Sequence, residues 1–384
     1  MYVLIIARGV PDERRPVNGI FEYDQARALT RAGCKVVFAA LDLRSFRRRR
    51  ALGFSRALRE GIPVFTASLP LSGLPEPLFL RAAKEALLRL YREITAIHGV
   101  PDILHAHFAD TAQIAALALK DCGVPLAVTE HGSLLNQKRA EDIPPAWRRA
   151  ANRAYSGAAG VAAVSPALAE NLRRHFGVEP AVIPNVVDTG LFFPGPAGKK
   201  AAGGPFSVVS AGNLTDNKNM ESLVKAFRLA FPPETGVTLT IFGGGPRRAA
   251  LEKMASDPAL SGRLLLPGPQ PRRVLAEAFR SSGCFALFSR SETFGVTFAE
   301  ALACGTPVAA AHSGGPEFFI TPKNGLLAPA QDVSAQAEVL RALREHNDRY
   351  DRPGISREIG KLVCPDAVAK ALLEFYGRLL NRRP

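Results

Sequence analysis

Two glutamates with seven residues between them are the feature of the sequence most suggestive of chemistry. Glu292 and Glu300 lie in the stretch SRSETFGVTFAEALACGTPV, residues 289–308. An apolar run typical of a buried strand, Gly283–Ser289, precedes them, and a helical pattern, Val296–Ala303, begins between them. Carboxylates so placed could act as acid and base, ligate a metal, hold a bound molecule or face water. Because no histidine or third carboxylate is nearby in sequence, we expect no metal site.

The surroundings of these glutamates favour a ligand that carries both phosphate and hydroxyl groups. Gly295 lets the chain turn into the helix, whose first backbone N–H groups at Phe294–Val296 could hold a phosphate. Glu292 and Glu300 are then placed on either side to accept hydrogen bonds from sugar hydroxyls. In the alternative interpretation, Glu292 only favours the helix dipole and Glu300 faces water. That alternative does not explain the apolar neighbours of Glu300, which predict a buried carboxylate with a partner.

A second candidate anion site lies in SAGNLTDNKN, residues 210–219. Lys218 stands just before a predicted helix, Met220–Ala230, where the helix dipole, backbone N–H groups and the ammonium group could bind phosphate together. A plain turn with a solvent-exposed lysine is the alternative.

Two glycine-containing turns could also approach a ligand closely. The stretch IFGGGP, residues 241–246, includes Gly244, and PVNGIF, residues 16–21, places Gly19 at the start of a predicted helix. Neither is a Gly-x-Gly-x-x-Gly fingerprint and the sequence has no P-loop, so nicotinamide-dependent and P-loop enzymes are not supported. Each turn alone could be purely structural.

Three histidines lie at predicted strand ends. His105 and His107 are two residues apart, so they share a face of one strand as a metal pair or, more simply, as packed core residues. His131 directly follows the strand-like Leu126–Thr129 and precedes Gly132, which permits a turn. It either points into a cleft between domains or is an ordinary loop histidine.

Strand-like segments alternate with helical patterns along the chain, which is typical of parallel sheets built from βαβ units. The strand-like segments are residues 2–7, 35–41, 102–106, 126–129, 160–164 and 181–183, and then 206–211, 237–242, 263–266, 283–289 and 306–311. Between the two series, residues 194–205 are rich in Pro, Gly and Lys and read as a linker. We therefore predict an α/β protein with two doubly wound domains, residues 1–193 and 206–364, that face a central cleft.

Composition and charge narrow the class of protein. The 384 residues suit two domains, and no apolar run reaches the length of a membrane span. The five cysteines are scattered, and the apolar start lacks the features of a signal peptide, so we expect a cytoplasmic protein.

The net charge of +14 would attract polyanions. Its densest source, Arg44–Arg50, is either a solvated loop or a patch for anionic lipid, which the amphipathic Leu78–Ile94 could assist. Few aromatic residues are interleaved with the basic ones, so nucleic acid is not an expected partner.

Taken together, the motifs resemble those of the retaining glycosyltransferases of family 4, which have the GT-B fold of two Rossmann-like domains. The matching stretches are the Gly-Ile-Phe turn at 19–21, TEHG at 129–132, AVIPNVVDTGLF at 181–192, SAGNLTDNKN, IFGGGP, LLLPG at 264–268, and the two-glutamate stretch followed by Gly-Thr-Pro-Val and Gly-Gly. The resemblance implies transfer of a sugar from a nucleotide diphosphate sugar to a glycan or glycolipid acceptor, without cofactor or metal. It also implies that a last helix, within residues 365–384, packs back on the first domain.

The resemblance also implies roles for particular residues. Catalytic positions would be His131, Glu292 and Lys218, and donor-binding positions would be Gly19, Gly212, Asn213, Lys218, Gly244, Leu266, Gly268, Glu292, Phe294, Gly295, Val296 and Glu300. Glu300 would hold the ribose and Glu292 the donor sugar. Lys218 and the backbone at Gly295–Val296 would hold the pyrophosphate, closed from the first domain by Gly19. His131 would lie by the sugar and acceptor, and the backbone around Leu266–Gly268 would meet the base.

One departure from the family pattern concerns charge. Asn213 stands where the family usually has arginine, so the phosphates depend more on Lys218 and on the helix N-terminus. No covalent nucleophile stands out, which favours a front-face route in which the leaving phosphate helps to deprotonate the acceptor. Two other hypotheses remain open: a sugar-nucleotide epimerase of the same fold, and a basic module, not an enzyme, that binds anionic lipid or nucleic acid.

Overall fold

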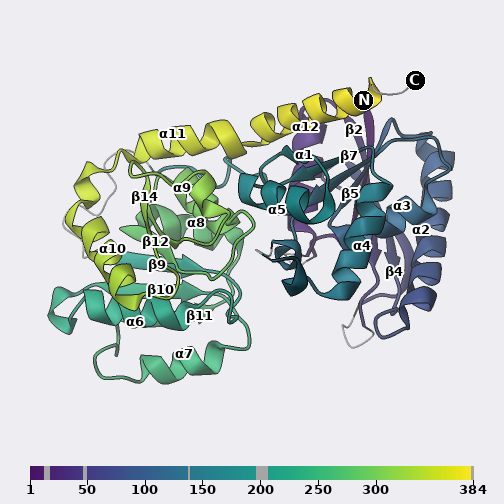
Figure 1. Ribbon diagram of the computed structural model, residues 1–384. Helices are drawn as coiled ribbons and strands as arrows, with labels where there is room; N and C mark the ends of the chain where they lie inside the picture. Colours follow the sequence, from purple (N-terminus) through teal and green to yellow (C-terminus); the bar gives the residue numbers. More distant parts are fainter. Residues whose placement is uncertain (13–17, 46–49, 137–138, 196–205, 382–384) are drawn as a thin grey trace. The chain divides into compact units, whose positions relative to one another are not determined.

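The chain forms two compact units. The computed structural model describes residues 1–12, 18–45, 50–136, 139–195 and 206–381 (Figure 1). The first unit comprises Met1–Val186 together with Pro365–Pro384, and the second comprises Val187–Cys364. Of the linker predicted at residues 194–205, the part 196–205 lies outside the described residues.

An eight-stranded sheet forms the centre of the first unit, in the order β3-β4-β2-β1-β5-β6-β7-β8. Its strands are β1 (Tyr2–Ala7), β2 (Lys35–Asp42), β3 (Gly53–Arg59), β4 (Ile62–Ser68), β5 (Ile103–His107), β6 (Leu126–Glu130), β7 (Gly160–Ala163) and β8 (Ala181–Val182). The pairs are parallel except for the hairpin of β3 and β4 at one edge. The order reverses at β1, so the loops after β1 and β5 flank a position where α/β sheets bind ligands.

Helices cover this sheet in two groups. They are α1 (Ile20–Arg31), α2 (Glu76–His98), α3 (Ala109–Ala118), α4 (Pro145–Ser156), α5 (Pro166–Phe176) and α12 (Pro365–Leu380). The helices α1 and α12 lie side by side, and α2, α3 and α4 pack in succession (Figure 1). β1 reads YVLIIA and is buried throughout, because helices leave neither face of a parallel sheet to water.

The last helix of the chain belongs to the core of the first unit. Along α12, Val368, Leu372, Phe375, Tyr376 and Leu379 recur at helical spacing and are all buried. This apolar stripe is the physical reason why the C-terminal segment packs on the N-terminal half of the chain.

The second unit has a six-stranded parallel sheet in the order β11-β10-β9-β12-β13-β14. Its strands are β9 (Ser207–Ala211), β10 (Thr238–Phe242), β11 (Leu264–Gly268), β12 (Cys284–Leu287), β13 (Val308–Ala311) and β14 (Gly325–Ala328). Its helices are α6 (Met220–Ala230), α7 (Arg248–Ala255), α8 (Arg272–Ser281), α9 (Val296–Ala303), α10 (Val333–Glu345) and α11 (Arg352–Val363). Here the order reverses between β9 and β12, the two strands that the glutamate and lysine motifs follow.

Three strands were not identified from the sequence. β3 and β4 form the hairpin at one edge of the first sheet, and β14 is an edge strand of the second sheet. β3 reads GFSRALR and is largely exposed, so it lacks the apolar signal of the central strands.

Candidate active site

The loops after β9 and β12 are held together in the second unit. The side chain of Asn217 donates from Nδ2 to the carbonyl of Ser291 (2.9 Å) and accepts through Oδ1 from the N–H of Ser291 (3.1 Å). The N–H of Arg290 also donates to the carbonyl of Asn217 at 2.8 Å. One asparagine therefore fixes the two motif loops against each other at the reversal of strand order.

This arrangement brings Lys218 and Glu292 into contact. Nζ of Lys218 lies 2.6 Å from Oε1 of Glu292, and the carboxylate is 8% exposed. The backbone of Glu292 is fixed as well, because its N–H donates to Ser313 and its carbonyl accepts from Gly315, each at 2.9 Å. The pair is thus a preformed charged centre, with an ammonium group and a carboxylate at one point of the sheet edge.

Glu300 is buried one turn inside α9, as its apolar neighbours predicted. It is 6% exposed, and its Oε1 lies 3.1 Å from Nη2 of Arg272, the first residue of α8. The guanidinium of Arg272 also lies over the ring of Phe192, 5.3 Å from the centroid. Sequence reasoning predicted a partner for Glu300 but did not identify Arg272.

Between the two glutamates lies the N-terminus of α9. Gly295 precedes the helix with φ 86°, a left-handed conformation that a residue with a side chain rarely adopts. No side chain caps this end, and Phe294, which is buried, and Val296 flank the glycine. Backbone N–H groups at an uncapped helix start attract anions.

The loops after β9, β10 and β11 meet along the same edge. The N–H of Gly212 donates to Phe242 (3.0 Å), and the N–H of Leu214 donates to Gly244 (2.9 Å). The N–H of Gly243 donates to Gly268 at 3.1 Å. The glycine motifs therefore form one continuous backbone surface, which includes the loop after β9 that carries Lys218.

Two further polar residues lie on this edge. Arg248, which the sequence did not single out, donates from Nη2 to the carbonyl of Leu266 at 3.2 Å. Asn213 is exposed, in the loop that carries Lys218. The guanidinium of Arg248 therefore lies beside the backbone of Leu266, and Asn213 adds no charge to the loop of Lys218.

In the first unit, three histidine side chains form a buried cluster. His105 and His107 of β5 have ring centroids 4.2 Å apart. Nδ1 of His107 lies 3.0 Å from Nε2 of His131, and Nδ1 of His131 lies 2.9 Å from Oδ1 of Asn185. His105 contacts the hydroxyl of Tyr376 at 2.6 Å. The packed-strand-end interpretation of His105 and His107 is confirmed, and His131 belongs to the same cluster.

The turn that carries His131 is fixed by Glu130. This carboxylate accepts hydrogen bonds from the N–H groups of Ala109 (2.9 Å), His131 (2.9 Å) and Gly132 (2.6 Å), and from the hydroxyl of Tyr155 (2.9 Å). It is fully buried, and burial raises its pKa. Four donors compensate the carboxylate for lost water, so Glu130 holds two loops of the sheet edge in place.

Gly19 caps the start of α1 with φ 69°. A Cβ on this residue would lie 2.2 Å from the carbonyl of Gly9, so the loop after β1 and the helix start approach too closely for a side chain. Phe21 of the same helix stacks against His131, with ring centroids 6.1 Å apart. Gly19 and His131 therefore belong to one region of the first unit.

Burial keeps the histidine cluster uncharged. It lowers the pKa of His105 and of His131 to about 3, and that of His107 well below its ordinary value. In the unfolded chain each imidazole takes up a proton near pH 6.5. The folded state then binds fewer protons, so this contribution to stability is complete above pH 6.5 and is lost as the pH falls towards 3.

The lowered pKa values predict that the free energy of unfolding falls measurably as the pH falls. Replacing His105 with glutamine should reduce the fall in unfolding free energy between pH 6.5 and 5 by up to about 1.4 kcal/mol per pH unit. The single tryptophan, Trp147 on α4, reports unfolding of the first unit in urea. Comparing slopes cancels the contribution of the carboxylates, and equal slopes would mean that His105 is protonated in the folded protein.

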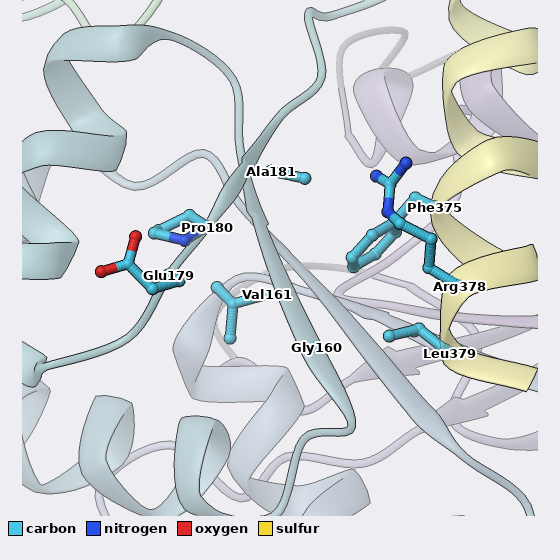
Figure 2. Close-up of a pocket in the computed structure, with 8 residues that line it drawn as sticks. All are labelled: Gly160, Val161, Glu179, Pro180, Ala181, Phe375, Arg378 and Leu379. Carbon is cyan, nitrogen blue, oxygen red and sulfur yellow. The ribbon is translucent and has the colours of Figure 1, made fainter. Parts of the chain in front are cut away.

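A pocket of the first unit lies away from these residues. Its volume is about 250 Å³, and it lies between β7, β8 and α12, as Figure 2 shows. Gly160 and Ala181, the first residues of β7 and β8, line it with Phe375 and Leu379. It therefore opens at the amino end of these strands, whereas His131 follows the carboxyl end of β6, and it is separate from the candidate site.

The basic run Arg44–Arg50 is partly used inside the first unit. Arg44 binds Asp42 with two nitrogens, at 2.6 and 2.8 Å. The side chain of Arg50 is 5% exposed, lies 3.3 Å from Asp42 and donates to several backbone carbonyls. Residues 46–49 lie outside the described part of the chain. The expectation of a lipid patch is wrong for Arg50, because its guanidinium is buried against the loop.

Comparisons with known proteins agree with this architecture. Residues 21–191 match a family described as Glycosyltransferase Family 4, and residues 196–356 match Glycosyl transferases group 1. The chain is 32% identical over 312 residues to a D-inositol 3-phosphate glycosyltransferase of Xylanimonas cellulosilytica, covering 74% of each protein. It is 30% identical over 287 residues to D-inositol 3-phosphate glycosyltransferase 1 of Catenulispora acidiphila, covering 68% of this chain and 69% of that one.

Solved structures show the same fold at low sequence identity. Sucrose-phosphate synthase from Thermosynechococcus elongatus superposes with a TM-score of 0.81 at 20% identity, over the whole of both chains. Anabaena Alr3699/HepE in complex with UDP and glucose superposes with a TM-score of 0.74 at 17% identity, over 98% of this chain and 100% of that one. The predicted GT-B fold is thereby confirmed.

Proposed function

The chain belongs to glycosyltransferase family 4 and transfers a sugar from a nucleotide sugar, and on this premise we propose that it retains the anomeric configuration of a nucleoside diphosphate sugar donor. The observation that carries the proposal is the edge of the second sheet, where the Lys218–Glu292 pair, the start of α9 and Glu300 follow one another. A donor of this class presents sugar hydroxyls, a diphosphate and ribose hydroxyls in the same order.

Each part of this edge then has one role. Glu292 accepts hydrogen bonds from hydroxyls of the donor sugar, and Glu300 accepts from the ribose. Lys218 and the N–H groups at Gly295–Val296 bind the diphosphate and stabilise the charge that develops as it leaves. These groups supply positive charge without a metal ion, so we propose that the reaction needs none.

The first unit supplies the acceptor end in this proposal. His131 lies beside the transferred sugar and the acceptor hydroxyl, and Gly19 permits close approach of backbone to the phosphates. No covalent nucleophile is required in a front-face reaction. The bond from the anomeric carbon to the phosphate oxygen breaks, and the acceptor oxygen bonds to the anomeric carbon. The leaving phosphate oxygen takes the proton of the acceptor hydroxyl. Retention of configuration follows from attack on the face that the phosphate leaves.

For the acceptor we propose a glycan or glycolipid in cell-surface polysaccharide or lipopolysaccharide synthesis. The named relatives are D-inositol 3-phosphate glycosyltransferases. Inositol 3-phosphate is therefore the acceptor against which the proposal must be compared.

A nucleotide-sugar panel tests the proposal. UDP-, GDP- and ADP-sugars are screened by thermal shift, since a ligand that binds only the folded state raises the melting temperature. The donor that binds is then incubated with glycan, glycolipid and inositol 3-phosphate acceptors in excess EDTA, and the product's anomeric configuration is determined by NMR. An inverted product, dependence on metal, or conversion of the donor to an epimer without acceptor would each contradict a stated part.

Membrane contact at the cytoplasmic face is a further part of the proposal, and the exposed residues of α2 support it. Leu78 near its start is 54% exposed, and Arg81 and Arg89 are exposed along the helix. Among the described helices, none is long and apolar enough to cross a bilayer. We expect the protein to sediment with anionic vesicles at low salt and to be released as salt rises; no sedimentation at low salt would remove this part.

A further inference from the structure

The histidine cluster gives His107 a defined relation to His131. The two rings are stacked, with centroids 5.3 Å apart and an angle of 28° between them. Nδ1 of His107 contacts Nε2 of His131 at 3.0 Å, and the other nitrogen of His131 contacts Oδ1 of Asn185 at 2.9 Å. Both nitrogens of His131 are therefore occupied by protein groups.

The direction of these hydrogen bonds follows from the chemistry of their ends. Oδ1 of Asn185 can only accept, so Nδ1 of His131 carries a proton and donates it. In a neutral imidazole the other nitrogen then has a lone pair, so Nε2 of His131 accepts from Nδ1–H of His107. Nε2 of His107 is left with a lone pair, and it is buried without a hydrogen-bond partner among the described residues.

A second proton on either ring is disfavoured by its surroundings. Arg8, at the end of β1, repels a charged His107 or His131, and burial acts in the same direction. The carboxylate of Glu130, the residue before His131, accepts from three backbone N–H groups and from Tyr155. Asp110 on α3 lies 4.0 Å from Arg8.

Uncharged side chains also pack against the cluster. The rings of Phe21 and Phe108 lie against His131, with centroids 6.1 and 4.9 Å away. His105 is engaged by Tyr376 of α12 (2.6 Å) and by Thr129 of β6 (2.8 Å). Among the described residues, no carboxylate forms an ion pair with His107 or His131, and the hydrogen bond of His131 to Asn185, which favours an imidazolium, is outweighed by burial and by Arg8.

We propose that His107 is a positioning residue that holds His131 in a single neutral tautomer, with Nδ1–H directed at Asn185 and Nε2 accepting from His107. The inference rests on the proposed role of His131 beside the transferred sugar. Its consequence is that His131 has no vacant nitrogen to take a proton from the acceptor. Deprotonation then falls to the leaving phosphate, which is the step that a front-face reaction requires.

The test compares His107→Asn with His107→Leu. An asparagine Nδ2–H can take the place of the Nδ1–H of His107, whereas leucine has no donor. In ligand-free enzyme with ¹⁵N-labelled histidine, NMR should show His131 protonated at Nδ1 alone from pH 5 to 8 in the wild type and in His107→Asn. In His107→Leu, Asn185 still accepts from Nδ1–H of His131, but Nε2 has lost its donor, so we expect Nε2 to take up a proton as the pH falls.

The kinetic readout should follow the same division. We expect kcat of His107→Leu to fall about tenfold with the donor KM little changed, and an acid limb near pH 6.5 that the wild type lacks. His107→Asn should recover most of the rate and lose the acid limb. Purely structural damage would lower activity in both variants without adding this limb.

The outcomes separate this inference from the proposed function. If Nε2 of His131 does not titrate and kcat is unchanged in His107→Leu, the positioning role is wrong. If the NMR result is as expected but His131→Leu retains wild-type turnover, the pair exists and the role proposed for His131 is wrong. Should His107→Leu fail to fold, His107→Asn still decides, because an Nε2-protonated His131 there, or in the wild type, would overturn the assignment.

Discussion

Replacing Lys218 with alanine is expected to lower kcat by about 10²- to 10³-fold. Nζ of Lys218 lies 2.6 Å from Glu292 on the loop fixed by Asn217, so the ammonium group is positioned before any donor binds. Such a group stabilises leaving-group charge without reorganising during the reaction. The effect should be large because Asn213 stands where the family usually has an arginine, and it has no charge to share the task.

The measurement is steady-state kinetics with the donor and acceptor varied separately. We expect the acceptor KM to change little. Lys253→Ala, an exposed lysine of α7 in the same unit, is the matched control and should be indistinguishable from the wild type. Equal losses of kcat and of acceptor affinity would count against a role on the leaving group.

A second variant separates a role of Lys218 on the leaving group from simple neutralisation of Glu292. Removing Lys218 also deprives the buried carboxylate of Glu292 of its cation, which by itself could disturb the site. Glu292→Gln in the Lys218→Ala background removes that charge. If activity recovered, the lysine would act by neutralising Glu292; we expect no recovery, because in the proposed function Glu292 itself binds the donor sugar.

The sequence predicted helices well where one local pattern determined them. The bounds of Met220–Ala230 and Val296–Ala303 agree with the structure, since an apolar stripe and a preceding Asn or Gly mark each helix. The edge strand β3 was missed because an edge strand needs no apolar alternation. Arg50 was interpreted as surface charge because a run of arginines does not reveal that one of them folds back on Asp42.

Contacts within the site were predictable only in part. Lys218 and Glu292 were expected to bind the same ligand, but their direct contact spans 74 residues and depends on β9 and β12 being neighbours. Strand order is decided by packing of whole βαβ units, which no local pattern encodes. Arg272 was missed for the same reason: it lies on α8, and only the packing of α8 beside α9 brings it to Glu300.

The histidines show the same limit. Spacing alone placed His105 and His107 on one face of a strand, and the structure confirms their contact. The contact of His107 with His131 depends on β5 pairing with β6. Asn185 lies in the loop after β8, 54 residues after His131, so no local pattern could have indicated its hydrogen bond to that histidine.

Replacing Glu300 with glutamine is expected to weaken binding of the donor nucleotide by about 10- to 100-fold. A carboxylate accepts from ribose hydroxyls more strongly than an amide does, since hydrogen bonds to charged groups contribute about 1.5–3 kcal/mol. The folded state should lose little stability. Glutamine has the same shape as glutamate, and its side-chain oxygen can still accept from Nη2 of Arg272, which lies 3.1 Å from Oε1 of Glu300.

The decisive measurement compares ribonucleoside and 2′-deoxyribonucleoside diphosphates by titration calorimetry, with the base that binds in the panel. The wild type should prefer the ribonucleotide, and Glu300→Gln should lose most of that preference while still binding both. Glu277→Gln, an exposed glutamate of α8, should keep it. A preference that survived in Glu300→Gln would show that Glu300 does not bind the ribose and that its pair with Arg272 only joins α8 to α9. Loss of the preference would instead give the two glutamates separate ends of one donor, with the phosphates at Gly295 between them.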